Sequence, residues 1–107
     1  MFEFDKVIFE SETPLGFLVR ITENQWRLIS EVKHSYMKEK LALVGFTLND
    51  PDIIRQSRSD PSVFLFYIEA GYKRWLCAVV KKENGTGFLI TSYITSAIKL
   101  GELIWTK

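Results

Sequence analysis

The stretch that decides the fold is "VFLFYI", Val63–Ile68. Every residue in it is apolar or aromatic, so an extended segment here would be buried on both faces. The run is short for a helix, and its content is typical of a strand in the interior of a sheet. We therefore expect a sheet built around residues 63–68.

Three further segments predict the strands beside it. The segment "KRWLCAVVKK" (73–82) follows after a short turn and ends just before Asn84-Gly85, a dipeptide typical of a tight β-hairpin. The chain then returns through "GFLITSY" (87–93). On the other side, "DIIRQS" (52–57) precedes the central strand across the turn "SRSDPS". These segments predict a four-stranded antiparallel sheet.

The N-terminal half predicts a hairpin and then helix. The segments "FDKVIFE" (4–10) and "GFLVRIT" (16–22) are strand-like and flank the turn "TPLG". Thr22 with Gln25 three residues later is a capping box, which predicts the start of a helix. An apolar series at helical spacing then runs up to a proline, and it consists of Met37, Leu41, Val44 and Leu48 before Pro51.

The joint within this helical half is open to two interpretations. Ser35 could cap a second helix and leave His34 between two helices, or one helix could run through. After the sheet, "TSAIKLG" (95–101) predicts a short helix or turn. The prediction is one α+β domain over residues 1–107, with an N-terminal hairpin and one or two helices packed on the four-stranded antiparallel sheet.

Composition sets limits on function. The 107 residues include 14 Lys or Arg and 13 Asp or Glu, a net charge of +1, so the chain lacks the basic excess typical of nucleic-acid binders, although a local basic patch is compatible with it. The single cysteine, Cys77, lies in an apolar run, which indicates a core position and a reducing compartment. Neither a membrane span nor a signal peptide is expected, and we predict a cytoplasmic protein with no membrane partner.

The sequence offers few groups for catalysis. One histidine and one cysteine do not make a zinc site, and the glycines form no phosphate loop, so we expect no metal and no cofactor. By strand alternation, Leu89, Thr91 and Tyr93 should share one face of their strand, and Arg55 and Ser57 should share a face of theirs, so one sheet face can hold an arginine, a threonine and a tyrosine together. An arginine fork and hydroxyl groups gathered on one sheet face are suited to binding phosphate.

Each candidate also has a structural interpretation. Threonine and tyrosine are common strand residues, and arginines on strands are most often surface charges. His34 is the natural acid or base at physiological pH, but the helix dipole also favours histidine at helix ends.

The order of short motifs adds weight to the functional interpretation. "NQWRLISEVKH", "VGFTLNDPDIIRQSRSD", "FLFYI", "KRWLCAVVKK" and "FLITSYITSAIKLGELIW" follow one another between Trp26 and Trp105. In this order they resemble small phage and bacterial domains grouped with the barnase–EndoU–colicin–RelE-like nucleases. The sequence departs from that pattern at Ser35 and Ser92, where such domains often have proline and alanine.

The resemblance implies a helical layer on a four-stranded antiparallel sheet and a metal-independent ribonuclease of toxin or mobile-element type. It places His34 on the family's histidine, Arg55 or Ser57 on the segment after "DPD", and Thr91 with Tyr93 on the last-strand motif. The partners it implies are RNA and a cognate inhibitor protein.

We therefore predict an endoribonuclease site. His34 would act as acid or base, Arg55 and Lys33 would hold the phosphate, and Tyr93 or Phe66 would stack on a base. The predicted catalytic residues are His34, Arg55, Thr91 and Tyr93; the predicted substrate-binding residues are Lys33, Ser57, Arg58, Lys81 and Lys99. The alternative is an inactive RNA- or protein-binding module, regulatory or antitoxin-like, and a third interpretation is a plain structural domain.

Overall fold

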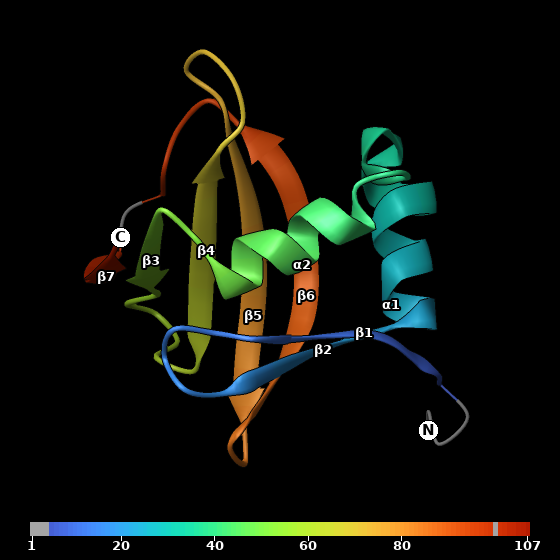
Figure 1. Ribbon diagram of the computed structural model, residues 1–107, viewed down its shortest axis with the longest axis horizontal. Coiled ribbons are helices and arrows are strands. Elements are labelled where there is room, and N and C mark those ends of the chain that lie inside the picture. The colour runs from blue at the N-terminus through green and yellow to red at the C-terminus, as the bar shows by residue number, and fades with distance from the viewer. Residues whose placement is uncertain (1–4, 100) are drawn as a thin grey trace.

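The computed structural model describes residues 5–99 and 101–107, which form a helical layer on one face of a single sheet (Figure 1). The strands are β1 (Val7–Glu12), β2 (Leu18–Thr22), β3 (Ile53–Gln56), β4 (Val63–Glu69), β5 (Trp75–Glu83), β6 (Thr86–Thr95) and β7 (Glu102–Thr106). The helical segments are α1 (Glu23–Arg27), the π-helix η1 (Leu28–Lys33), the 3-10 helix η2 (Ser35–Met37) and α2 (Leu41–Asn49).

The prediction of a four-stranded antiparallel sheet is wrong, because the sheet has seven strands and is mixed. Its order is β1-β2-β6-β5-β4-β3-β7, so the four expected strands are its middle. At one end β7 pairs antiparallel with β3, and at the other β2 pairs parallel with β6. Both of these pairings join segments that are far apart in the chain, and no local turn motif predicts such pairing. Phe4, where the first predicted strand begins, lies outside the described residues.

The parallel contact between β2 and β6 is short and depends on a glycine. It consists of two residue pairs, Val19 with Gly87 and Arg20 with Phe88. A Cβ on Gly87 would lie 2.8 Å from the Phe17 ring, 2.9 Å from Val80 and 3.0 Å from Val19. The absence of a side chain therefore allows the N-terminal hairpin to close onto the sheet.

The close packing around Gly87 predicts how an added methyl group changes the stability of the protein. Gly87→Ala is expected to lower the free energy of unfolding by about 1–3 kcal/mol, because the added methyl overpacks three core side chains. Urea unfolding measures the change. Phe17→Leu in the same chain should recover part of the loss by making room. Additive losses in the double variant would contradict this account.

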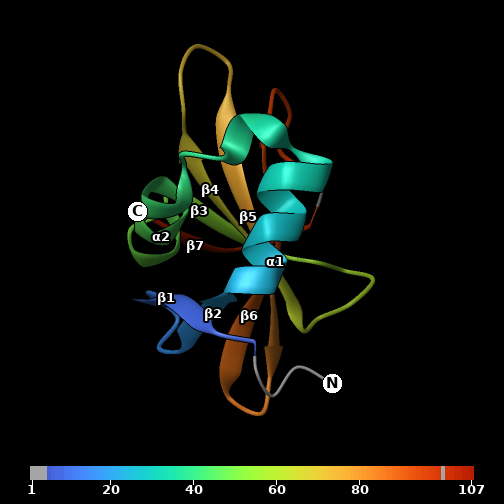
Figure 2. The same ribbon diagram turned by 90° about the vertical axis from the view of Figure 1, so that its right-hand side faces the viewer.

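A hydrogen bond joins α1, the start of the helical layer, to β6. Thr22 caps α1 as predicted, accepting a hydrogen bond from the backbone N–H of Gln25 at 3.3 Å. The Gln25 side chain does not complete the capping box. Its amide donates instead to the carbonyl of Ile90 on β6. Figures 1 and 2 show α1 standing beside β6, on the side away from β5.

The main core lies between the helices and the sheet. Phe66 on β4 is fully buried there, so the expectation that it could stack on a base is wrong. It packs in one cluster with Ile54 and Leu76 from neighbouring strands and with Val44 and Leu48 from α2. Most of the apolar burial, and hence most of the hydrophobic stabilisation, is on this face.

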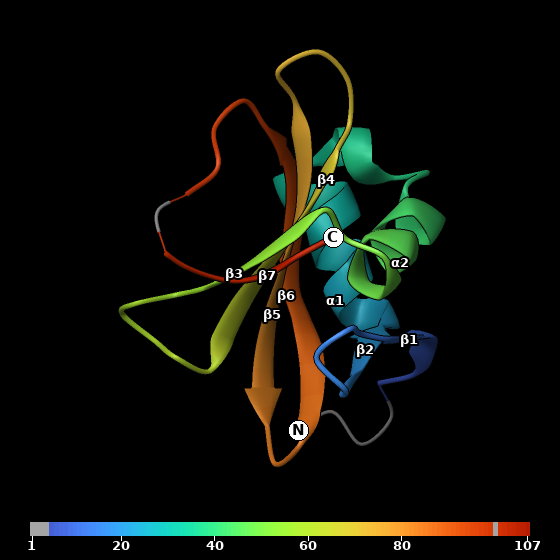
Figure 3. The ribbon, with the colours of Figure 1, turned by 60° about the vertical axis from the view of Figure 1, so that its left-hand side comes forward.

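The opposite face carries a smaller cluster around Leu65, Tyr67 and Cys77. Cys77 is buried, as predicted. Figure 3 shows the chain between β6 and β7 crossing this face, on the side away from the helices. Ile98 packs against the cluster, and the backbone N–H of Lys99 donates to the Tyr67 hydroxyl at 3.1 Å. The short helix considered for this segment is not formed by residues 96–99 and 101.

A β-bulge in β6 corrects the predicted strand faces. Val80 pairs with Leu89 and Val79 with Thr91, so Ile90 is an extra residue on β6. Leu89 therefore faces the helices and is buried in the main core, whereas Thr91 and Tyr93 face the other side. The expectation that Leu89, Thr91 and Tyr93 share one face is wrong, because strict alternation fails at a bulge.

Candidate functional site

Most of the predicted site residues lie on the sheet face opposite the helices, which we call the site face. Strand register sets their spacing. Tyr93, Cys77 and Tyr67 lie side by side across β6, β5 and β4, and Thr91 lies in the next row, opposite Val79. Thr91 and Tyr93 are thus neighbours along β6, as the sequence predicts.

His34 lies next to Tyr93, at the end of an irregular helix. The segment η1 is a π-helix in which the backbone N–H of His34 donates to the carbonyl of Ile29 at 2.8 Å. His34 then separates η1 from η2, so the chain has a joint here. The His34 ring lies 5.9 Å from the Tyr93 ring, centroid to centroid. π-Helical turns are rare and are often found at functional sites.

Tyr36 orients the histidine. Its hydroxyl accepts a hydrogen bond from the backbone N–H of Ile94 at 3.3 Å, and lies 3.5 Å from Nδ1 of His34. The Tyr36 oxygen accepts from Ile94 with one lone pair, and its second lone pair can accept from Nδ1–H of His34. In that tautomer Nε2 carries no proton and is the nitrogen that can meet a substrate.

A cavity of about 380 Å³ opens on the site face next to Tyr93. Two serines form part of its rim and Lys99 another part, while the remaining walls are mostly apolar. We call it the Ser57 pocket. Its lining residues are Ser57, Ser59, Val63, Leu65, Val79, Thr91, Tyr93 and Lys99.

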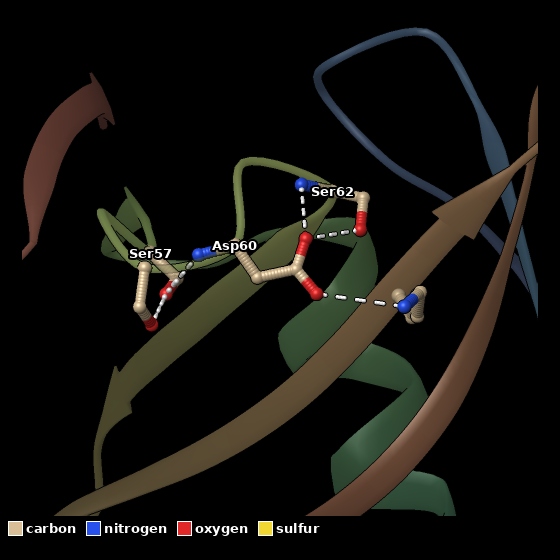
Figure 4. A network of polar contacts seen from close by, with 5 residues as sticks. Ser57, Asp60 and Ser62 are labelled. Carbon is tan, nitrogen blue, oxygen red and sulfur yellow. Dashed lines mark hydrogen bonds and ion pairs between the residues drawn. The ribbon is translucent and has the colours of Figure 1, made fainter.

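The turn between β3 and β4 fixes the serine side of this pocket (Figure 4). The Asp60 backbone N–H donates to Ser57 Oγ at 3.3 Å, and Ser57 Oγ lies 3.1 Å from Ser59 Oγ. The Asp60 carboxylate accepts from the Ser62 hydroxyl at 2.6 Å and from the Ser62 N–H at 3.1 Å. These bonds, and secondarily Lys81, lower the pKa of Asp60.

Three buried side-chain polar atoms of the described residues have no hydrogen-bond partner, and all belong to predicted catalytic residues. They are Arg55 Nε, Thr91 Oγ1 and Tyr93 Oη. All three residues lie on the site face, which the connection between β6 and β7 crosses. An unpaired buried polar atom costs about 1–3 kcal/mol, and its presence calls for a specific explanation.

Arg55 does not join the His34 cluster. It lies in the same row of the sheet as Thr91, but three strands away, about 14 Å at the usual strand spacing. Its Nη1 donates to the carbonyl of Gly101 at 2.9 Å. Arg55 thus holds the start of β7 in place, at the far end of the site face.

The predicted substrate-binding cations are dispersed. Lys99 Nζ lies 5.5 Å from the centre of the Tyr93 ring and belongs to the Ser57 pocket. Lys81 lies on β5 and pairs with Asp60, with Nζ 3.4 Å from the carboxylate. Lys33 and Arg58 are exposed, and neither lines the pocket.

A second cavity, of about 430 Å³, lies where β2 diverges from β6. Its polar lining residues already have partners: Asp5 accepts from Asn24, Arg20 pairs with Glu10 at 2.9 Å, and Thr22 caps α1. Gln25 bonds to β6. The orphan polar atoms of the site face have no counterpart among the described residues here. We therefore place the candidate site at the Ser57 pocket and His34.

The hydroxyl and thiol groups under this site are held in their neutral forms. Burial raises the pKa of Tyr67 to about 12 and that of Cys77 to about 11. Burial also raises the pKa of Tyr93. Tyr93 is therefore a neutral hydrogen-bond donor at physiological pH, and Cys77 is an unreactive thiol.

These shifts predict alkaline destabilisation. The folded-state pKa values of Tyr67 and Cys77 exceed those of an unfolded chain, so their stabilising contribution is complete below about pH 9 and is lost as the pH rises toward 12. Urea unfolding at about pH 8 and about pH 11 should show a loss of about 3–4 kcal/mol. Tyr67→Phe should reduce this loss by about 1 kcal/mol. An unchanged pH dependence in that variant would contradict the assignment.

Sequence reasoning missed three contributors to the site. Tyr36 orients His34, η1 is a π-helix, and Ser59 completes the pocket rim, whereas the joint at His34 is one of the two interpretations that the sequence leaves open. A signal existed for Ser59, because a serine before aspartate in a turn commonly bonds to nearby backbone and side-chain groups. The Tyr36 contact depends on β6, which is distant in sequence, and no local pattern predicts it.

Comparison of the chain with family models, with curated proteins and with solved structures found no match. Within residues 5–99 and 101–107, no three His, Cys, Asp or Glu side chains are grouped so that they could hold a metal ion. In the same residues, no helix has the length and apolar content needed to cross a membrane.

Proposed function

We propose that the chain is a metal-independent endoribonuclease that cleaves RNA by attack of a ribose 2′-OH, acting in the cytoplasm. The observation that carries the proposal is the placement of the only histidine 5.9 Å from the ring of Tyr93, a residue whose hydroxyl, like that of Thr91, is buried without a hydrogen-bond partner. The ordered motifs that resemble nuclease domains also support it. Toxin-like activity would require a cognate inhibitor protein as a partner.

The chemistry follows from the geometry. The 2′-oxygen attacks the adjacent phosphorus, the bond to the 5′-oxygen breaks, and the 2′-proton must be removed. In the proposal, His34 Nε2 is the proton-transfer atom, while solvent protonates the leaving 5′-oxygen. In the tautomer whose Nδ1–H donates to the Tyr36 hydroxyl oxygen, Nε2 carries no proton and accepts the 2′-proton, and the imidazolium formed then releases that proton to solvent.

The remaining groups bind and stabilise. Lys99 takes the phosphate-binding role first assigned to Arg55, because Arg55 is bonded to Gly101 whereas Lys99 lies over Tyr93. Thr91 and Tyr93 line the Ser57 pocket and would position the nucleotide there, because their hydroxyl oxygens are buried and do not meet the phosphate directly. Lys33 and Arg58 are exposed and can meet the RNA backbone outside the pocket.

An RNA-binding module without cleavage is the second candidate. Two observations favour it: Lys99 is the one cation lining the Ser57 pocket among the described residues, and the net charge of the chain is only +1. A nuclease usually gains affinity from many contacts between basic side chains and phosphates.

Incubation of the purified chain with end-labelled RNA in the presence of a chelator separates the two candidates. The nuclease proposal expects fragments that carry 2′,3′-cyclic phosphate ends. An electrophoretic shift of intact RNA without fragments would favour the binding module. RNA that is neither bound nor cut would contradict both.

A further inference from the structure

We infer that the Ser57 pocket is a base-binding subsite and that it selects uracil; this inference rests on the proposed action on RNA. The pocket adjoins the proposed reaction centre, because Tyr93 both contacts His34 and lines the pocket. A nucleotide whose phosphate lies near His34 and Lys99 would therefore place its base in this cavity.

The walls favour a base over a phosphate group. Val63, Leu65 and Val79 form an apolar part of the lining, and apolar surface suits the face of a planar ring. Lys99 is the single charged residue of the lining. An anion buried against such walls would lose much of its hydration for one cationic contact.

The serine rim always presents a hydrogen-bond donor. Ser57 Oγ already accepts from the Asp60 N–H, and it shares one hydroxyl hydrogen bond with Ser59. If Ser57 donates to Ser59, the Ser59 proton is free, and if Ser59 donates to Ser57, the Ser57 proton is free. Either way one O–H is left to donate into the pocket, and the Lys99 ammonium adds donors from another side.

The acidic group of the turn does not compete for these donors. The Asp60 carboxylate is occupied by Ser62 and Lys81. In the view of Figure 4 it points toward Ser62 and away from Ser57. A rim of donors selects a base rich in carbonyl acceptors. Uracil presents carbonyl oxygens to such a rim, whereas cytosine places an amino donor where uracil has an acceptor.

The test compares uridine 3′-monophosphate, cytidine 3′-monophosphate, guanosine 3′-monophosphate and inorganic phosphate by calorimetry and by NMR titration. We expect the uridine nucleotide to bind about tenfold more tightly than the cytidine nucleotide. The Ser57→Ala/Ser59→Ala double variant should reduce this preference to about twofold or less, with binding of inorganic phosphate unchanged. Equal binding of the two pyrimidine nucleotides, tighter binding of guanosine nucleotide, or no nucleotide binding would overturn the inference.

Ser62→Ala is the matched control. Ser62 belongs to the same turn but does not line the pocket, so the uridine preference should persist. Loss of the preference in this variant as well would assign the effect to the shape of the turn and overturn the role of the two hydroxyls. The tests of function and subsite fail separately. RNA cleavage without a uridine preference removes the subsite alone, whereas a uridine preference without RNA cleavage removes the nuclease proposal alone.

Discussion

His34→Ala is expected to lower the rate of RNA cleavage about 10²–10⁴-fold, the usual contribution of a positioned proton-transfer group. The chain has no second histidine to replace it. The free energy of unfolding should change by no more than about 1 kcal/mol, because His34 is only partly buried and lies in a helix joint. The measurement is single-turnover cleavage of labelled RNA beside urea unfolding of the same variant.

Two further variants show whether the loss of cleavage in His34→Ala comes from the position of the imidazole or from the charge around it. Lys33→Ala changes the exposed neighbour of His34 and should weaken RNA binding uniformly without removing cleavage. Tyr36→Phe keeps the ring but removes the hydroxyl next to Nδ1, so it should reduce cleavage by a smaller factor than His34→Ala and alter its pH profile. Cleavage by folded His34→Ala at the wild-type rate would refute the assignment.

The middle of the sheet was predictable because its signals are local. The apolar run at β4 and the Asn84-Gly85 turn between β5 and β6 each fix a strand or a turn within a few residues. Asn84 has φ +51° and Gly85 +84°, the left-handed backbone that this dipeptide tolerates well. The sequence predicts the N-terminal hairpin but neither its pairing with the sheet nor the strand β7, because both pairings are non-local: Val19 on β2 pairs with Gly87 on β6, 68 residues later in the chain.

The site was predictable in residue type more than in arrangement. The sequence places Thr91 and Tyr93 on one strand face, and the structure keeps that pair. Two irregularities of the backbone complete the site. The bulge at Ile90 turns the pair away from the helix-face core, and the π-helix brings His34 to Tyr93. Strict periods of two and 3.6 residues contain no information about such insertions.

One face of the sheet provides most of the stability, and the opposite face carries the proposed chemistry. The helix face carries the large apolar cluster, whereas the site face carries the unpaired polar atoms and the Ser57 pocket. Unpaired polar atoms make a face less stable, so the opposite face must provide the compensating burial. A truncation on the helix face should therefore reduce stability strongly and leave the site chemistry intact in the folded chain.

Phe66→Ala tests this division. Phe66 is fully buried among strand and helix side chains, and truncation there is expected to lower the free energy of unfolding by about 3–5 kcal/mol. The loss combines the removed apolar surface with the cavity that rigid neighbours leave behind. The free energy of unfolding of a small domain is only about 5–15 kcal/mol in total, so the urea concentration at the midpoint of unfolding should be much lower in this variant.

Phe66→Leu is the matched control, since it keeps most of the volume and should cost about 1–2 kcal/mol. Both variants should retain the uridine preference and the cleavage rate under conditions where they are folded, because the Phe66 side chain points away from the site face. If Phe66→Ala were to cost less than its leucine counterpart, the core would not lie where the packing of α2 against β4 and β5 places it. If cleavage were to fall in the folded protein of either variant, the two faces would be coupled, and the site would depend on the helical layer for more than the position of His34.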